Sequence, residues 1–316
     1  YEQGTIAMKN KPLFAVLAAG TFWGFMGLFA RKLNAAGFGA LEVAQARITT
    51  GLILVGLYLL IFDRKSLKIR LKDIWCFIGT GIVSLFFFSL CYFSALNYTS
   101  LSVAAILLYT APVFVMLMSL FLFKEKMNLQ KVLGLILAFA GCVLVSGIGG
   151  DSSVSTIGIL LGLGSGFFYA LYSIFGRYAI NRGYGAWTMT FYTFLFCTIS
   201  CTFLSDWKLM GSAVAADISI LFWILGLGFV TAFLPYVLYS YALENMESSK
   251  ASILASIEPV VGTLCGVFIF HEPITIGGVV GIVLVLCAIA VLNLPAKKAK
   301  RHGVSMPKLN GPRSKI

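Results

Sequence analysis

The sequence predicts an all-α membrane protein with ten transmembrane helices arranged as a 5+5 inverted repeat and with both termini in the cytoplasm. Three observations support this fold class: the composition, the spacing of apolar runs and an internal duplication. Of the 316 residues, 59% are hydrophobic and only 11% are charged, against about 25% charged in a typical soluble domain. A soluble fold of this length has too little interior for so much apolar surface, so lipid must solvate much of the protein.

Ten apolar runs of roughly 20 residues follow one another, and this length is enough to cross a hydrocarbon core of about 30 Å. Each run must be a helix, because an open strand in lipid would leave backbone N–H and C=O groups unpaired. The predicted spans are residues 12–32, 41–62, 73–96, 101–123, 129–149, 156–180, 186–205, 218–243, 249–270 and 275–294.

The stretch Tyr92–Leu137 occurs twice. A shift of 147 residues aligns it with a second copy without a gap, and 16 of the 46 positions are identical. Shared apolar composition would not readily align Pro112 with Pro259 and Glu125 with Glu272 in one register. Each copy belongs to a unit of five spans, and an odd number of spans inserts the second unit upside down.

The distribution of lysine and arginine predicts the orientation. Of 24 such residues, 20 lie on the side of the termini, three lie on the other side, and Arg47 lies within the second span. The positive-inside rule then predicts that both termini lie in the cytoplasm. We expect a multi-pass protein of the cytoplasmic (inner) membrane, in contact with lipid. The net charge of +12 sits in short loops and in the tail, which argues against nucleic acid as a partner.

Three regions follow from these patterns. Residues 8–150 form the first five-helix repeat and residues 151–294 form the second, inverted repeat. Residues 295–316 form a basic cytoplasmic tail that we expect to be disordered. Inverted repeats are typical of secondary transporters, since two halves that exchange conformations generate an inward-open and an outward-open state. The sequence contains no ATP-binding motif, and the expected partner is a small-molecule substrate.

The chain also resembles a known family in a series of short motifs. These are Phe22-Trp23-Gly24, Arg47, Tyr92 to Leu96 continuing into Ser102 and Ala104, Pro112 leading to Glu125, Glu258-Pro259-Val260, and Glu272 to Thr275. In this order the motifs resemble the EamA-type ten-helix members of the drug/metabolite transporter superfamily, over about residues 12–294. The resemblance implies a central cavity lined by spans 1, 3, 4, 6, 8 and 9, with spans 5 and 10 at the periphery. Members of the family carry amino acids, other metabolites, nucleotide-linked compounds or quaternary ammonium compounds, commonly outward.

Glu258 is the clearest charge within a span. An acidic group at the centre of a membrane helix costs about 2.5–3.5 kcal/mol on insertion scales, so a cation, a proton or a backbone donor must compensate for it. One interpretation is a cavity group that binds a cationic substrate or takes up a coupling proton. The other is a structural carboxylate that satisfies backbone groups freed by Pro259, whose ring removes one N–H from the helix.

Arg47 is the second charge within a span. It could neutralise a substrate carboxylate, or it could pair with a carboxylate such as Glu42 on its own helix. A separation of five residues lies just beyond the favourable helical spacing. Because span 2 is less central in the family, we favour a structural or gate pairing for Arg47.

Aromatic residues make up 14% of the chain. Buried tyrosine hydroxyls need hydrogen-bond partners and therefore avoid lipid. Several aromatic residues lie in the middle of spans that should line the cavity, and with Glu258 they are the candidate substrate-binding residues, although packing remains the alternative for each one: Trp23, Tyr92, Tyr109, Tyr169, Tyr172, Tyr236 and Tyr239. Aromatic walls beside a carboxylate would suit a small amphipathic or cationic solute through cation–π contacts.

Three prolines lie inside spans: Pro112, Pro235 and Pro259. Such prolines free carbonyl groups and allow local bending, so we interpret them as hinges of spans 4, 8 and 9, with static packing as the alternative. Glu125 and Glu272 end spans 4 and 9 and are each followed three residues later by Asn128 or Thr275, which are good helix N-caps. Capping of the next helix is the simpler interpretation, and salt bridges that latch alternate gates are the other.

The sequence therefore predicts a secondary transporter that moves a small metabolite, an amino acid or related compound, by alternating access and in the direction of export. Uptake or facilitated diffusion of a quaternary ammonium compound such as choline is the alternative. No cofactor or metal is expected, since the chain has two histidines and none of its seven cysteines forms a Cys-x-x-Cys pair. An enzyme would need a cluster of catalytic groups that this sequence does not supply. Protons are the expected coupling ion.

Overall fold

The structure is a computed structural model that describes residues 2–146 and 155–294. The predicted boundary between the repeats, at residues 150 and 151, and the predicted tail, 295–316, lie outside the described residues. Helices and turns are the regular structure of the described part.

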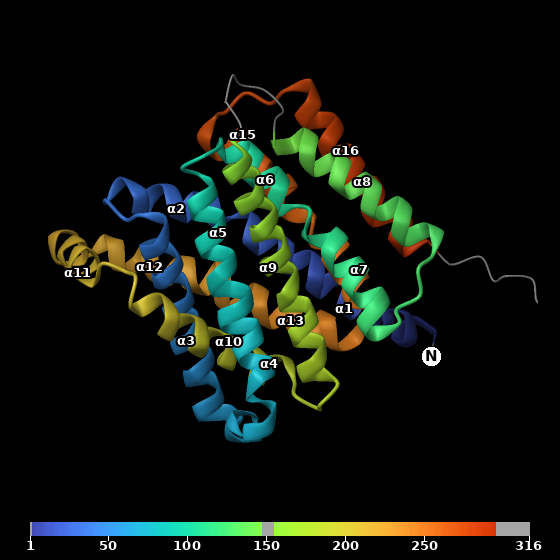
Figure 1. Cartoon of the computed structure of the whole chain (residues 1–316), viewed down its shortest axis with the longest axis horizontal. Helices are drawn as coiled ribbons and strands as arrows, with labels where there is room; N and C mark the ends of the chain where they lie inside the picture. The colour runs from blue at the N-terminus through green and yellow to red at the C-terminus, as the bar shows by residue number, and fades with distance from the viewer. Residues whose placement is uncertain (1, 147–154, 295–316) are drawn as a thin grey trace, which may run out of the picture.

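The first half is built from helical segments, several of which continue one another across short breaks (Figure 1). They are α1 (Glu2–Gly24), α2 (Met26–Ala35), α3 (Ala40–Phe62), the 3₁₀ turns η1 (Arg64–Leu67) and η2 (Leu71–Asp73), α4 (Ile74–Ile78), the π-helical segment η3 (Gly79–Phe86), α5 (Phe87–Ala95), α6 (Leu101–Leu108), α7 (Ala111–Phe123) and α8 (Leu129–Ser146).

The second half follows the same plan. Its segments are α9 (Thr156–Ile180), α10 (Ala186–Thr202), α11 (Trp207–Ala216), α12 (Ser219–Gly228), the π-helical segment η4 (Phe229–Phe233), α13 (Leu234–Asn245), α14 (Ser248–Leu254), α15 (Ile257–Phe270) and α16 (Ile276–Asn293).

Nine helical stretches of the described residues are long and apolar enough to cross a membrane. The tenth span is a bent pair, in which α10 has 17 residues and α11 turns away from it by 98°. The prediction of an all-α membrane protein with ten spans is therefore confirmed, and the seventh span is shorter than expected, because its helix ends at Thr202. The cytoplasmic location of the termini stays a prediction.

Spans 4 and 9 are broken at equivalent places. In span 4, α6 ends at Leu108 and α7 begins at Ala111; in span 9, α14 ends at Leu254 and α15 begins at Ile257. The two breaks coincide to within one residue at the shift of 147 that aligns the copies. A proline follows each break inside the first turn of the next helix, where its missing N–H costs nothing.

Spans 3 and 8 also share an irregularity. Span 3 contains the π-helical segment Gly79–Phe86, and span 8 contains Phe229–Phe233 directly before Pro235. Segments of this kind are rare and occur mostly where a helix is adapted to a functional site. Only the second copy has a proline beside the segment, so proline alone did not reveal the irregularity in span 3.

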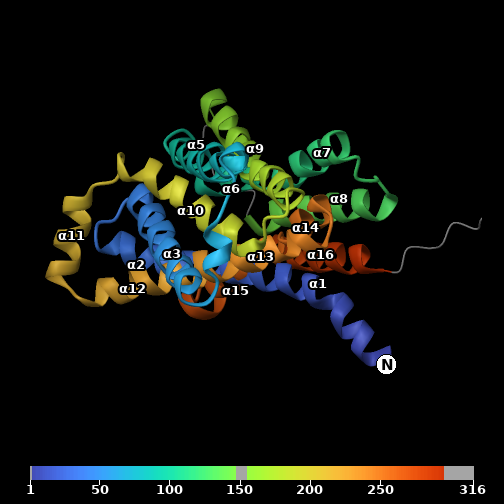
Figure 2. The ribbon, with the colours of Figure 1, turned by 90° about the horizontal axis from the view of Figure 1, so that it is seen from below.

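The two last spans of the halves, α8 and α16, lie side by side at one edge of the bundle (Figures 1 and 2). Their backbones approach closely, because a Cβ added at Gly281 would lie 2.7 Å from the carbonyl oxygen of Gly141. Small residues permit such close contact between helices in lipid. The peripheral position of spans 5 and 10 agrees with what the family resemblance implies.

Both peripheral helices begin with the predicted side-chain caps. The Asn128 Oδ1 atom accepts a hydrogen bond of 2.8 Å from the Lys131 N–H, and the Thr275 Oγ1 atom accepts one of 3.0 Å from the Gly278 N–H. The capping interpretation of these two residues is therefore confirmed.

We expect Thr275→Ala to lower the stability of the protein by about 1 kcal/mol, because it removes the acceptor that satisfies a free N–H at the start of α16. Thr275→Ser keeps the hydroxyl and serves as the control. Thermal unfolding of the detergent-purified protein measures the effect. Equal unfolding temperatures for the alanine and serine variants would show that the cap contributes nothing.

Candidate functional site

A cavity of about 490 Å³ lies in the middle of the bundle and reaches the surface beside Arg31 and Asn34, which are exposed. Its walls come from α1 and α2, α3, α5, the break between α6 and α7, α9, α13, and the break between α14 and α15. These elements include spans 1, 3, 4, 6, 8 and 9, which the resemblance implies. They also include span 2, which the resemblance does not imply.

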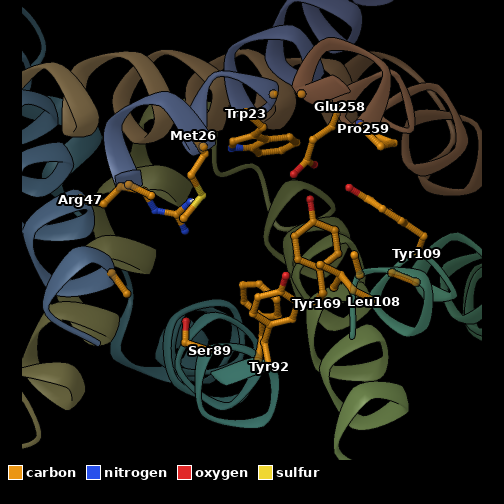
Figure 3. Close-up of a pocket in the computed structure, with 18 of the residues that line it drawn as sticks. Trp23, Met26, Arg47, Ser89, Tyr92, Leu108, Tyr109, Tyr169, Glu258 and Pro259 are labelled. Atoms are coloured by element: carbon orange, nitrogen blue, oxygen red, sulfur yellow. Dashed lines mark hydrogen bonds between the residues drawn. The ribbon is translucent and has the colours of Figure 1, made fainter. Parts of the chain in front are cut away.

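Seven of the eight predicted substrate-binding residues line this cavity: Trp23, Tyr92, Tyr109, Tyr169, Tyr236, Tyr239 and Glu258. Figure 3 shows side chains from distant parts of the chain directed into one space. The structure therefore brings these residues together, while their contact with a substrate stays a proposal.

Trp23, Tyr236 and Tyr239 form the aromatic floor of the cavity. The ring centroid of Trp23 lies 5.3 Å from that of Tyr236 in an edge-to-face arrangement and 5.4 Å from that of Tyr239. Edge-to-face pairs are a favourable geometry for aromatic rings and fix their orientation. Only 5% of the Trp23 surface is exposed, so neighbouring side chains hold its ring in a fixed orientation within the aromatic floor.

Tyr172 lies behind this floor instead of on the cavity. Its ring packs edge-on against Tyr236 at 5.4 Å, and its hydroxyl forms a hydrogen bond of 2.8 Å with the Ser240 hydroxyl. A second pair, Ser173 and Tyr239, is joined by a hydrogen bond of 2.9 Å. These buried contacts hold the floor residues in place, so Tyr172 can act on the cavity only through its neighbours.

Glu258 lies in the first turn of α15, directly after the break in span 9. Its carboxylate points into the cavity, and the hydroxyls of Tyr109 and Tyr169 point towards it from two sides (Figure 3). The positive end of a helix macrodipole stabilises a negative charge in this position. None of the ion pairs formed by the described residues involves Glu258.

Arg47 also lines the cavity, although the sequence favoured a structural or gate pairing for it. In the described part of the chain Arg47 forms no ion pair, and Glu42 instead accepts a hydrogen bond of 3.2 Å from the backbone N–H of Asp206. The structural pairing of Arg47 with Glu42 was therefore wrong, and a gate pairing in another conformation stays a prediction. The rotation of α3 about its axis, which decides what Arg47 faces, could not be read from one apolar span.

Two of the three predicted hinge residues, Pro112 and Pro259, line the cavity at the helix breaks. Pro235 follows the π-helical segment of span 8 and is buried beside the cavity residue Tyr236. All three thus occupy places where the helical hydrogen-bonding pattern changes. Their motion as hinges stays a prediction.

This architecture, a bundle of ten apolar spans around a central cavity with broken helices at its centre, defines a multi-pass membrane transporter. The chain belongs to the EamA-like transporter family, whose model matches residues 10–147 and 156–294 in two separate halves.

Similar proteins agree with this assignment. An uncharacterized transporter of Archaeoglobus fulgidus is 28% identical over 273 residues, which cover 86% of this chain and 95% of the relative. A second one from the same organism is 31% identical over 200 residues, 63% of this chain and 70% of the relative. The uncharacterized transporter YvbV of Bacillus subtilis is 26% identical over 243 residues, 76% of this chain and 78% of the relative.

One solved crystal structure superimposes with a TM-score of 0.72 over 90% of this chain and 96% of its own. Its sequence is 17% identical, so the similarity shows a shared fold.

Two glycines on successive turns of span 1 test where the cavity begins. A Cβ added at Gly24 would lie 2.8 Å from the carbonyl oxygen of Glu258, whereas one added at Gly27 would meet nothing within 4 Å. We expect Gly24→Ala to destabilise the protein by about 1–3 kcal/mol through overpacking. Gly27→Leu should change stability by less than about 0.5 kcal/mol.

Thermal unfolding of both variants in detergent provides the measurement. If Gly27→Leu destabilises the protein as much as Gly24→Ala does, the space beside Gly27 is filled and the cavity does not extend to the surface there.

Proposed function

We propose that the protein is a secondary transporter that moves a small metabolite across the cytoplasmic membrane by alternating access. The observation that supports this proposal is that the cavity opens towards one face of the bundle and is closed towards the other by polar contacts between the two halves. We call these the open face, marked by Arg31, Asn34 and Glu272, and the closed face, marked by Glu125, Lys131 and the start of α14.

At the closed face, Glu125 from the end of α7 receives the start of α14. Its carboxylate accepts hydrogen bonds from the backbone N–H groups of Ser248, at 2.8 Å, and Ser249, at 3.3 Å, and from the Ser249 hydroxyl. Lys131 lies 3.7 Å from this carboxylate and 2.5 Å from that of Glu247. The Lys131 side chain is 6% exposed and that of Glu125 is 9% exposed, so the contact between these two residues is shielded from water. The Glu247 side chain is 49% exposed.

Arg177 of α9 completes the closed face. Its Nε atom donates a hydrogen bond of 3.0 Å to the Ser248 hydroxyl, and its terminal nitrogen donates to the carbonyl oxygen of Met246. A separate hollow lined by Glu125 and Arg177 lies at this face and shares no lining residue with the central cavity.

The open face carries residues that are equivalent to Glu125 and Arg177 of the closed face. The repeat aligns Glu272 with Glu125 and Arg31 with Arg177. Glu272 pairs with Arg31 in the structure, and their side chains are 48% and 53% exposed. The same two residue types therefore occur at both faces, and exchange of the two halves' conformations would bring Glu272 to the start of α6.

The alignment supports this exchange further, because the Ser249 position that binds Glu125 is also a serine, Ser102, in the first copy. We propose that the open face closes when Glu272 binds the start of α6. Glu125 binds the start of α14 in the same way at the closed face. With the termini in the cytoplasm, the closed face would be cytoplasmic and the structure would be outward-open.

The proposed substrate is an amino acid or related compound, and the proposed direction is export. The aromatic floor and the few polar groups of the cavity suit a small amphipathic solute, since binding sites of this kind combine apolar walls with a few placed polar groups. Facilitated uptake of a quaternary ammonium compound such as choline is the second candidate, because Glu258 lies among tyrosines that could make cation–π contacts.

The two carboxylates at the faces should have opposite effects on the conformation. We expect Glu125→Gln to weaken the closed face and to reduce the fraction of molecules open at Gly27. Hydrogen bonds to a charged group contribute about 1.5–3 kcal/mol, which corresponds to about a tenfold or larger change in population. Glu272→Gln should leave that fraction at or above its original value, since exposed ion pairs contribute about 0–1 kcal/mol.

The measurement is the rate at which a hydrophilic maleimide labels a Gly27→Cys reporter, with the protein lacking the reporter as background. A Glu125→Gln variant that is labelled as fast as its parent would contradict the proposed closure.

Proton coupling through Glu258 is the proposed energy source, because this group is the acidic residue that lines the cavity. A carboxylate that cannot hold a proton and a cationic substrate group at the same time exchanges one for the other. We expect transport in proteoliposomes to respond to a pH step and Glu258→Gln to abolish the response. Glu42→Gln, which changes a carboxylate away from the cavity, should retain it. Transport that is unaffected by the pH step in all three proteins would exclude proton coupling.

A further inference from the structure

Arg47 is a buried cation without an anionic partner among the described residues. Its exposed fraction is 6%, and its Nε atom has no hydrogen-bond partner in the described part of the chain. One terminal nitrogen donates to the Met26 sulfur at 3.1 Å. A thioether is a weak acceptor, so most of the five N–H donors of the guanidinium are available to another group.

The surroundings make this arrangement costly in the absence of an anion. Removing a charge from water costs several kcal/mol even after the protein relaxes, and an unpaired buried charge is strongly destabilising. Intramembrane arginines therefore pair with acids, carbonyl groups or ligands. The Arg47 guanidinium points into the cavity (Figure 3), where an incoming anionic group can reach it.

The wall that carries Arg47 is otherwise apolar. Ala40, Val43, Ala44 and Arg47 line the cavity at successive helical spacings along one face of α3. These small side chains leave room beside the guanidinium and offer it no acceptor. The planar guanidinium matches a carboxylate in a two-bond geometry that lysine cannot reproduce.

Glu258 and Arg47 lie on opposite walls of the cavity (Figure 3). The remaining charged lining residue, Arg31, lies at the mouth and is paired with Glu272. Among the residues that the structure describes, the interior thus presents one fixed positive and one fixed negative group. A simple cation would be attracted by Glu258 and repelled by Arg47, and a simple anion would meet the reverse.

We infer that Arg47 binds a carboxylate of the substrate and that the cavity selects a zwitterion, whose ammonium group lies towards Glu258 and the tyrosines. The inference rests on the proposed transport function and deepens it by naming the substrate class. Primary ammonium groups, as in amino acids, and quaternary ones, as in betaines, share this chemistry, because both are attracted by a carboxylate and by aromatic faces. Choline lacks the carboxylate and fits only half of the site.

Two pairs of compounds that differ by a carboxylate test the inference on the whole protein. The first pair is L-phenylalanine and phenethylamine, and the second is glycine betaine and choline. Binding to the detergent-purified protein is measured by calorimetry or by the ligand-induced shift in unfolding temperature. We expect the carboxylated member of at least one pair to bind on the order of ten- to a hundredfold more tightly than its partner, as loss of a charged hydrogen-bonded group implies.

Variants then assign the preference to Arg47. Arg47→Met should remove the preference for the carboxylated member, and Arg47→Lys should restore part of it. Lys32→Met, which removes a positive charge from the same face outside the cavity, should leave the preference unchanged. The comparison of ligands in the unmodified protein needs no variant, so a variant that fails to fold does not prevent the test.

Several outcomes would overturn the inference: equal or tighter binding of both compounds that lack the carboxylate, no binding of either carboxylated compound, or an undiminished carboxylate preference in Arg47→Met. Counterflow in proteoliposomes distinguishes a failure of the carboxylate-site inference from a failure of the transport proposal. Arg47-dependent binding without counterflow would reject transport and keep the carboxylate site. Counterflow of choline or phenethylamine at rates equal to those of the carboxylated partners would reject the carboxylate site alone.

Discussion

The need to satisfy every backbone polar group within lipid governs where this bundle can be irregular. Spans 4 and 9 each lose regular helical hydrogen bonding within the span, before Pro112 and Pro259. Non-helical backbone within a membrane span is stable only where protein surrounds it or water reaches it. Both breaks therefore have to face the interior, and the cavity lies where they meet. The break also exposes the N-terminal end of α15, which gives the Glu258 carboxylate a favourable electrostatic position.

The two copies are similar at the open and closed faces and different where the cavity is lined. Glu125 and Glu272 are retained at the two faces, whereas Ala111 in the first copy corresponds to Glu258 in the second. In the proposed cycle, the symmetric framework would supply two related conformations, and the asymmetric lining would give the cavity one orientation for its ligand. A charge that is present in only one of the two copies would distinguish the two ends of a bound molecule.

Much of this could be predicted from the sequence, because apolar length and duplication are strong signals. The spans follow from apolar length, the repeat follows from the duplication, and the aromatic lining follows from tyrosine hydroxyls, which need hydrogen-bond partners and avoid lipid. The environment of Arg47 could not be predicted, since one span taken alone does not show which helices pack against each of its faces. The position of Tyr172 behind the cavity could not be predicted for a similar reason. Tyr169 and Tyr172 are three residues apart and lie on the same side of their helix, yet only Tyr169 reaches the cavity. The π-helical segment of span 3 has no proline to reveal it.

Lys131 bears on the energetics of the proposed transport cycle. It binds two carboxylates at the closed face, and the aligned residue of the second copy is Gly278, which can form no such contact. In that cycle the two end states would differ in energy, and the form with the closed face shut would be favoured. A solute that approaches from that face would meet a binding-competent form only in a minor fraction of molecules, and its apparent Kd would rise by the inverse of that fraction. One lysine without a counterpart would thus make the affinity of a structurally symmetric carrier unequal on the two sides of the membrane.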